Sequence, residues 1–223
     1  MRFQDILERN RAWVDECARI DPQMIAREAG QHQPKMLWIG CSDARVPANV
    51  VTQTKLGEMF VHRNIANLVV PTDTNLLAVV QYAVEVLQVG AVIVCGHYGC
   101  GGVKAAMGSG APPHVDNWLA HIRGTIRIHA DELDALPTED ARYERLVELN
   151  VMEQVYNLSR LAPVQEAWAS GRSLQLHGCV YPVTTGLLRD LGVTMDGSRP
   201  EPVMERTPAV ARVAERQPVV ALR

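Results

Sequence analysis

The sequence lacks an excess of basic residues and lacks any long apolar run, and both absences exclude broad classes of protein. Lysine and arginine number 22 against 25 aspartates and glutamates, giving a formal net charge of −3. Charges of both signs are interspersed, so no basic stripe is available to neutralise a phosphate backbone, and we expect no nucleic-acid partner. No stretch of about 18 consecutive apolar residues occurs, which predicts that the chain has no membrane span.

A dense cysteine framework is also missing. The cysteines form an odd, widely spaced set: Cys17, Cys41, Cys95, Cys100 and Cys179. This pattern argues against a secreted disulfide scaffold and favours free or metal-bound thiols. The first twenty residues contain no apolar core of the kind that a signal peptide has, so we expect a cytoplasmic protein.

The composition is that of a globular protein. Hydrophobic residues make up 47% and charged residues 21% of 223 residues, which suits one domain of ordinary size. We expect a single domain over residues 1–196, in which residues 1–34 form an N-terminal helical arm. Residues 197–223 contain four prolines and are expected to form an extended tail.

Apolar strands alternate with helical patterns along the chain. Short apolar runs at residues 36–40, 59–61, 91–95 and 173–180 are typical of buried strands. Helical patterns cover residues 73–88, 115–133 and 139–170, the first with Thr72 or Asp73 as its N-cap. Buried strands separated by helices predict an α/β fold with a central, mostly parallel sheet flanked by helices.

Two polar segments follow strands of this predicted sheet. Cys41-Ser42-Asp43-Ala44-Arg45 follows one strand, and His97-Tyr98-Gly99-Cys100-Gly101 follows another. If the two strands are neighbours, Cys41, His97 and Cys100 meet at one edge of the sheet, because catalytic loops lie at the carboxyl ends of parallel strands. Two thiolates and one imidazole are a zinc ligand set, and a catalytic site keeps the fourth position open.

The dyad that follows Cys41 is placed to control that fourth position. Asp43 is close enough in sequence to occupy it, and Arg45 could pair with Asp43 and hold it away from the metal. A His-x-x-Cys pair alone is weak support for a metal site, and Cys41 alone would be interpreted as a small buried apolar residue. The combination after two predicted strands favours metal binding.

These motifs, Cys-Ser-Asp-x-Arg and then Gly-His-x-x-Cys-Gly, resemble the signature of the β-carbonic anhydrase family. The resemblance extends over roughly residues 1–195, including residues 57–67, 81–97, 148–151 and 177–178. It implies a carbonate dehydratase that interconverts carbon dioxide and bicarbonate. It also implies one Zn²⁺ per subunit on Cys41, His97 and Cys100, with Asp43 and Arg45 as the catalytic dyad.

The same resemblance implies a substrate pocket and an assembly. Phe60 and Tyr82 are expected to shape a narrow apolar pocket near the metal of a neighbouring subunit, and the Gly101 amide to bind substrate. The resemblance also implies an obligate homodimer, and it leaves open whether two such dimers pair into a tetramer.

A second layer of resemblance concerns a bacterial subclass that bicarbonate regulates. Five residues match its non-catalytic bicarbonate pocket: Trp38, Gly40, Val46, Arg63 and Tyr181. In that subclass bicarbonate favours a closed state in which the aspartate of the dyad binds zinc and activity is lost as pH falls. Ala44 and Pro182 depart from the usual pattern, and Pro182 removes an amide donor beside Tyr181.

Two rival functions remain open at this level. The same metal and dyad could serve a hydrolase of carbonyl sulfide or carbon disulfide, since only pocket access distinguishes the two. A zinc-bearing bicarbonate sensor without turnover is the alternative outside enzymes, although it would have no need of Asp43 and Arg45.

Overall fold

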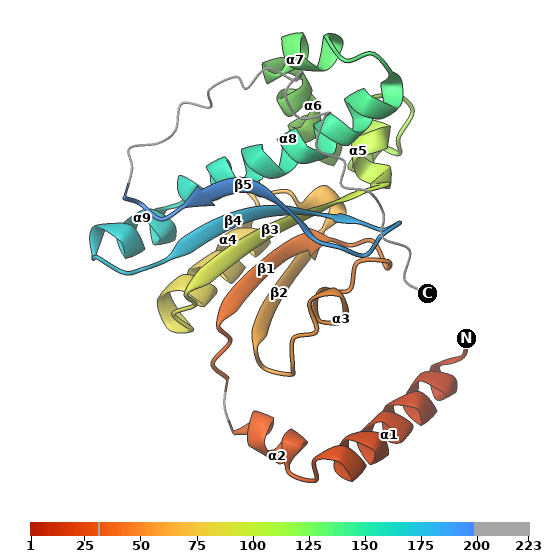
Figure 1. The fold of residues 1–223 in the computed structure, drawn as a ribbon, viewed down its shortest axis with the longest axis vertical. Helices are drawn as coiled ribbons and strands as arrows, with labels where there is room; N and C mark the ends of the chain where they lie inside the picture. The colour runs from red at the N-terminus through yellow and green to blue at the C-terminus, as the bar shows by residue number, and fades with distance from the viewer. Residues whose placement is uncertain (31, 199–223) are drawn as a thin grey trace.

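Parallel strands dominate the sheet at the centre of the molecule (Figure 1). The computed structural model describes residues 1–30 and 32–198, so the predicted tail lies outside the described residues from position 199 onward. The described strands are β1 (Met36–Cys41), β2 (Met59–Asn64), β3 (Ala91–Tyr98), β4 (Gln175–Pro182) and β5 (Arg189–Met195). Their order is β2-β1-β3-β4-β5, with the first four parallel and β5 antiparallel to β4. The expectation of an α/β fold is confirmed.

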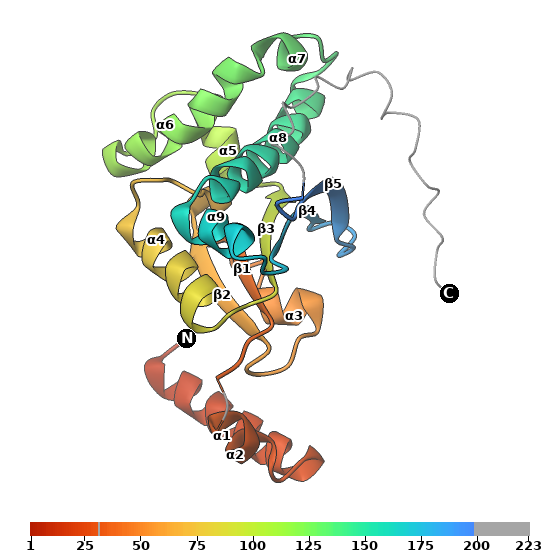
Figure 2. The ribbon, with the colours of Figure 1, turned by 90° about the vertical axis from the view of Figure 1, so that its left-hand side faces the viewer.

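The sheet has one deeply buried face and one that is thinly covered. Leu37 and Ile39 of β1 point into the large core, whereas Trp38 between them joins a small cluster on the opposite face with Cys95. This alternation follows from the two-residue period of a strand. Helices α4 (Thr74–Gln81), α8 (Glu139–Ser159) and α9 (Ala162–Ala169) lie on the first face. Among the described elements, only the short helix α3 (Ala48–Thr52) is drawn against the second (Figure 2).

The helices cover most of the remaining described chain. They are α1 (Phe3–Ile20), α2 (Met24–Ala29), α3 (Ala48–Thr52), η1 (Ile65–Asn67), α4 (Thr74–Gln81), η2 (Tyr82–Val86), α5 (Gly101–Ala106), α6 (Pro113–Ile128), α7 (Ala130–Asp134), α8 (Glu139–Ser159) and α9 (Ala162–Ala169). Asp73 caps α4 by accepting the Asn75 amide at 3.0 Å, as the sequence predicts. After Gln81 the helix continues as the π-helical turn η2.

The long helix predicted over residues 139–170 is interrupted. It ends at Ser159, and α9 starts at Ala162 with Pro163 in its first turn. Proline has no amide hydrogen to donate to the preceding turn, so the helix cannot run through unbroken. The Ser159 carbonyl instead accepts a hydrogen bond from Gln165 Nε2 at 2.6 Å.

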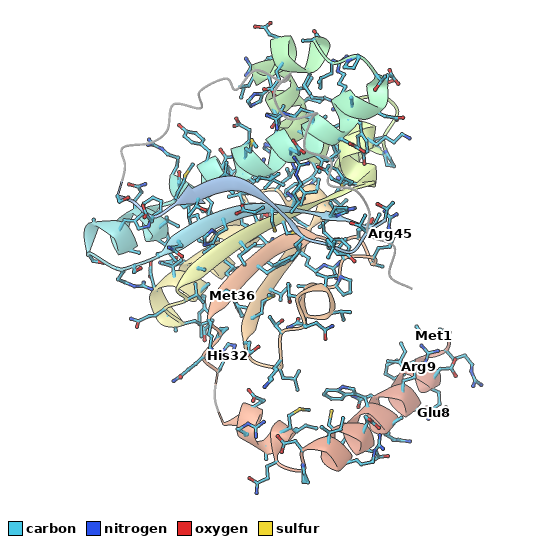
Figure 3. All side chains as sticks on the ribbon, in the orientation of Figure 1. Met1, Glu8, Arg9, His32, Met36 and Arg45 are labelled. Carbon is cyan, nitrogen blue, oxygen red and sulfur yellow. The ribbon has the colours of Figure 1, made fainter. Side chains whose placement is uncertain are left out.

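The N-terminal helices stand apart from the sheet. Helices α1 and α2 project away from the body, and Met1, Glu8 and Arg9 are seen far from Met36 (Figure 3). Phe3, Trp13 and Ile20 are exposed on α1. No helix in the described residues has the length and apolarity needed to cross a membrane.

Candidate metal centre

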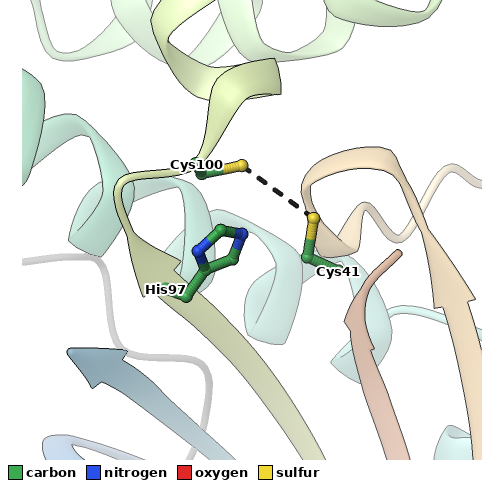
Figure 4. A group of neighbouring side chains, drawn as sticks. All are labelled: Cys41, His97 and Cys100. Atoms are coloured by element: carbon green, nitrogen blue, oxygen red, sulfur yellow. Dashed lines mark hydrogen bonds between the residues drawn. The ribbon is translucent and has the colours of Figure 1, made fainter. Parts of the chain in front are cut away.

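Three potential ligands converge at the carboxyl end of the parallel strands. Cys41 is the last residue of β1, His97 lies near the end of the adjacent strand β3, and Cys100 precedes α5. The Sγ atoms of Cys41 and Cys100 are 4.0 Å apart, and one ligand atom from each of the three residues lies within 4.8 Å of the others (Figure 4). All three side chains are buried. The predicted convergence therefore occurs in the structure.

The imidazole of His97 is oriented for metal binding. Its Nδ1 lies 3.1 Å from the Tyr98 carbonyl, to which it donates a hydrogen bond. Its Nε2 is buried and has no hydrogen-bond partner among the described residues. A metal-ligating histidine ordinarily donates its second ring nitrogen to a carbonyl or carboxylate in this way. The buried, unpartnered Nε2 beside two thiols therefore fits a tetrahedral metal such as zinc.

The two thiols share their protons unequally. The Cys100 thiol, as hydrogen-bond partner, lowers the pKa of Cys41 to about 4. The same pairing, followed by burial, raises the pKa of Cys100 well above the ordinary range. Two adjacent thiols give up one proton readily and resist losing the second, because two thiolates repel. A divalent cation removes that repulsion.

A backbone amide also points at Cys41. The N–H of Ala66 donates to the Cys41 Sγ at 3.4 Å. Ala66 has a φ of 63°, a left-handed conformation that is strained for a residue with a Cβ. The sequence analysis did not predict this contact, because no residue pattern around Ala66 indicates a left-handed backbone.

Asp43 and Arg45 form a bidentate ion pair. Arg45 Nε lies 2.9 Å from Asp43 Oδ1, and Nη2 lies 2.7 Å from Oδ2. The Asp43 Oδ2 is also 3.7 Å from the Nε2 of His97, close to where a metal would be bound. Hydrogen bonds from Arg45 hold the pKa of Asp43 well below its usual range, so the carboxylate is ionised at neutral pH.

Arg45 also joins the two polar loops. Its Nη2 donates to the Gly99 carbonyl at 3.0 Å. Gly99 has a φ of 78°, which glycine adopts without strain. The turn between His97 and Cys100 therefore depends on glycine, and it presents a carbonyl that fixes the guanidinium of the dyad.

The residues expected to line the substrate pocket lie in two places. Gly101 is the first residue of α5, beside Cys100, and a Cβ added to it would meet no atom within 4 Å. Phe60 pairs in register with Leu37, near the start of β1 and away from Cys41. The rings of Phe60 and Tyr82 lie 5.9 Å apart. Phe60 therefore lies near the opposite end of the strands from the chain's own metal centre, with Tyr82 against it.

The residues expected to form the bicarbonate pocket are neighbours in space. Trp38 and Tyr181 pack in the same small cluster, and the Trp38 Nε1 is buried with no hydrogen-bond partner among the described residues. Gly40 adjoins them, because a Cβ there would lie 2.4 Å from that Nε1. Arg63 pairs in register with Gly40 and donates to the Cys41 carbonyl at 2.8 Å and to the Asp43 carbonyl at 2.5 Å. Val46 is buried, and its backbone N–H donates a hydrogen bond to the Asp43 carbonyl at 3.0 Å.

Comparison with known proteins gives the site a family. The family model described as carbonic anhydrase matches residues 36–188, which include all three potential ligands and the dyad. A carbonic anhydrase from Emericella nidulans is 43% identical over 192 residues, covering 86% of this chain and 84% of the relative. The chain belongs to the β-class carbonic anhydrase family. As a carbonic anhydrase it is an enzyme.

Solved β-carbonic anhydrases have the same fold. One from Sordaria macrospora, described as tetrameric, has a TM-score of 0.82 and 38% identity and covers 86% of this chain and 98% of its own. Another, from Coccomyxa in complex with acetazolamide, has a TM-score of 0.84 and 37% identity and covers 88% of this chain and 89% of its own. The resemblance inferred from the motifs is thus confirmed at the level of family and fold.

Proposed function

We propose that this carbonic anhydrase catalyses the reversible hydration of carbon dioxide to bicarbonate and a proton, with one zinc ion per chain held by Cys41, His97 and Cys100. The observation that carries the proposal is the convergence of these three buried ligands, whose ligand atoms lie within 4.8 Å of one another. Bound there, zinc would lower the pKa of water from about 15.7 to about 7 and so supply a nucleophile at ordinary pH.

In this proposal Asp43 and Arg45 orient the nucleophile. Because Arg45 occupies both oxygens of Asp43, the carboxylate is held back from the fourth coordination position. Asp43 then accepts a hydrogen bond from the attacking water and directs its lone pair at the substrate carbon. The low pKa of Asp43 suits this role, because the carboxylate stays an acceptor across the working pH range.

The apolar part of the substrate pocket comes from a neighbouring subunit. Phe60 and Tyr82 lie away from their own Cys41, and Tyr82 is 44% exposed, so both are available to a second chain. Gly101 is an exposed residue at the start of α5, and its amide would bind a substrate oxygen beside the metal. A small apolar slot suits carbon dioxide.

We infer a homodimer that pairs into tetramers. Exposed apolar side chains on α1, including Phe3 and Trp13, offer a surface for a second subunit. The relative from Sordaria macrospora is described as tetrameric, which supports the higher assembly. The cytoplasmic location stays a prediction from the sequence.

We also propose that bicarbonate and pH regulate the enzyme through the pocket of Trp38, Arg63 and Tyr181. Arg63 supports the carbonyls of Cys41 and Asp43, so an anion that attracts its guanidinium would loosen the loop carrying Asp43. Asp43 would then leave Arg45 and take the fourth position. The Asp43 carboxylate would stay ionised while hydroxide becomes scarcer at low pH, so the site would close and activity would fall with pH.

Stopped-flow hydration at neutral and at alkaline pH, with and without added bicarbonate, tests this regulation. High activity at alkaline pH with inhibition by bicarbonate supports it. The W38A and Y181F variants should flatten the pH profile and lose the inhibition. Unchanged profiles in both variants would contradict the regulatory proposal while leaving the hydration reaction intact.

Substrate choice is tested separately by supplying carbon dioxide, carbonyl sulfide and carbon disulfide to zinc-loaded enzyme. We expect carbon dioxide to be turned over far faster than either sulfur analogue. A preference for a sulfur compound would favour the hydrolase alternative, and turnover of none would favour the sensor.

A further inference from the structure

Helix α8 presents polar side chains to the loops that carry the metal ligands. Most of its buried residues are apolar, as expected for a helix packed on β3 and β4. Polar residues nevertheless recur on its inner side, and Asn150 is only 1% exposed. Buried polar groups destabilise the fold unless they are hydrogen-bonded. The hydrogen-bond partners of these side chains therefore show which segments α8 fixes in place.

The first of these contacts reaches the loop of Cys100. Tyr143, about one turn from the start of α8, donates its hydroxyl proton to the Cys100 carbonyl at 2.9 Å. The two preceding carbonyls also accept hydrogen bonds. Arg45 donates to the carbonyl of Gly99, and His97 donates to the carbonyl of Tyr98. The turn from Tyr98 to Cys100 is therefore fixed at each successive carbonyl, and Tyr143 supplies the contact at the ligand itself.

The second contact reaches the segment that faces Cys41. Asn150 Nδ2 donates to the Ala66 carbonyl at 3.0 Å, and Ala66 in turn donates its N–H to the Cys41 Sγ. Asn150 Oδ1 accepts from Gln154 Nε2 at 3.1 Å, and Gln154 Oε1 accepts the Val69 amide at 2.7 Å. A residue with a Cβ keeps a left-handed backbone only when its surroundings impose it. Asn150 contributes the hydrogen bond to the carbonyl of Ala66 itself, while Trp118 donates to the preceding carbonyl of Ile65.

We propose that Tyr143 and Asn150 are positioning residues for the metal centre, each fixing the backbone beside one of the two thiolate ligands. One helix thereby sets the distance between Cys41 and Cys100, which come from loops 59 residues apart in the chain. The proposal rests on the metal site of the proposed function. It assigns to α8 a part in retaining the metal besides its part in the core.

Removal of either contact should loosen one ligand without removing it. Hydrogen-bonding partners of metal ligands typically contribute 10- to 100-fold in metal affinity or activity. Because Tyr143 and Asn150 bond to backbone carbonyls rather than to the ligand atoms, we expect Y143F and N150A each to weaken zinc binding at the lower end of that range, by about tenfold. Both should also shift the visible absorption of the cobalt-substituted protein, because that spectrum reports the geometry of the ligands rather than the stability of the fold.

Helix α8 offers a matched control for each variant. Tyr156 lies on the same helix and is likewise half-buried, and its hydroxyl donates no hydrogen bond to residues 97–100 in the described structure. Asn157 donates to the Val69 carbonyl at 3.3 Å and to Gln154 Oε1 at 3.4 Å, so N157A perturbs the outer part of the same network without removing the contact to Ala66. The Y156F and N157A variants should therefore bind zinc within about twofold of the parent.

The experiment measures zinc affinity by chelator competition and the cobalt spectrum for the parent and all four variants. Weakened zinc and altered spectra in Y143F and N150A alone support the proposal. Parent-like affinity and spectra in folded Y143F overturn it even if N150A fails to fold, because Y143F removes a single hydroxyl. Failure of the parent to bind zinc or cobalt contradicts the proposed metal site itself, which distinguishes that outcome from a failure of α8 to position the ligands.

Discussion

Arg45 holds both carboxylate oxygens of Asp43 and, with the same Nη2, the carbonyl of Gly99. One guanidinium therefore connects the loop that follows β1 with the loop that follows β3. Arg45 fixes the direction of the Asp43 carboxylate and keeps it ionised beside the metal centre. We therefore expect substitution of Arg45 to impair the proposed reaction.

The R45Q variant should lower kcat/KM for carbon dioxide hydration by about 10²- to 10³-fold, the range for losing one preorganised polar group. R45K should also be impaired, because lysine cannot hold both oxygens of Asp43 in a planar fork. Zinc content should be unchanged in both, since Arg45 is not a ligand. Stopped-flow assays with parallel zinc analysis measure these effects.

R123Q is the matched control for R45Q. Arg123 pairs with Asp116 at 2.6 Å on α6, outside the loops that carry the ligands. Its loss should leave kcat/KM within about twofold of the parent, as is usual for a partly exposed ion pair. Equal losses in R123Q and R45Q would contradict a specific role for the dyad.

Mixed assemblies test whether Tyr82 serves the metal centre of a neighbour. Y82A and C100S homo-oligomers should each be poorly active, the first through its pocket and the second through its metal. Mixed assemblies should regain activity, because the zinc site of a Y82A chain then faces an intact Tyr82 on a C100S chain. Activity in mixtures no higher than the average of the two separate variants would contradict a shared site.

His62 should make stability depend on pH. It is 6% exposed, and burial lowers its pKa, although Asp73 opposes the shift. The unfolded chain then binds more protons than the folded one just below the ordinary histidine pKa of about 6.5. Its contribution to stability is therefore present above that value and is lost as pH falls below it.

The H62Q variant should have a shallower decline in the free energy of unfolding between pH 7 and pH 5 than the parent, measured by urea denaturation. H114Q serves as control, because His114 is exposed on α6. A decline in H62Q as steep as in the parent would show that another group controls the pH dependence.

Gly96 allows the close approach of α8 to β3. A Cβ at this position would lie 2.6 Å from Val151 Cγ2, a buried and stiff side chain. G96A should cost about 1–3 kcal/mol in the free energy of unfolding, the usual range for overpacking. G124A, in α6, adds a Cβ to open space and should stabilise by about 0.5–1 kcal/mol. Urea denaturation of both variants tests the contrast.

The convergence of the three potential ligands was predictable because buried apolar runs indicate strands and each polar loop follows one directly. Cys41 and His97 needed only the parallel pairing of β1 and β3 to meet. Strand β5 was missed, because Arg189, Asp190 and Gly192 interrupt its apolar pattern and its pairing with β4 contains a register shift. Local sequence carries little information about such an edge strand.

The contacts of α8 with the segments beside Cys41 and Cys100 could not be predicted from the sequence for a different reason. Asn150 and Tyr143 fall within an ordinary helical pattern, and their partners Ala66 and Cys100 are distant in the chain. Only the packing of α8 over the carboxyl ends of the strands brings them together. By contrast, the sequence could have predicted the end of α8 before Pro163, because proline breaks a helix.

The most direct test of the account is carbon dioxide hydration by one preparation measured as isolated, after zinc removal by a chelator, and after return of one zinc per chain. The account predicts that the rate falls with zinc content and is restored by one equivalent, and that C100S neither retains zinc nor recovers. Full activity in the zinc-free protein, or no activity with one zinc confirmed per chain, would contradict the assignment of Cys41, His97 and Cys100 as the catalytic metal site.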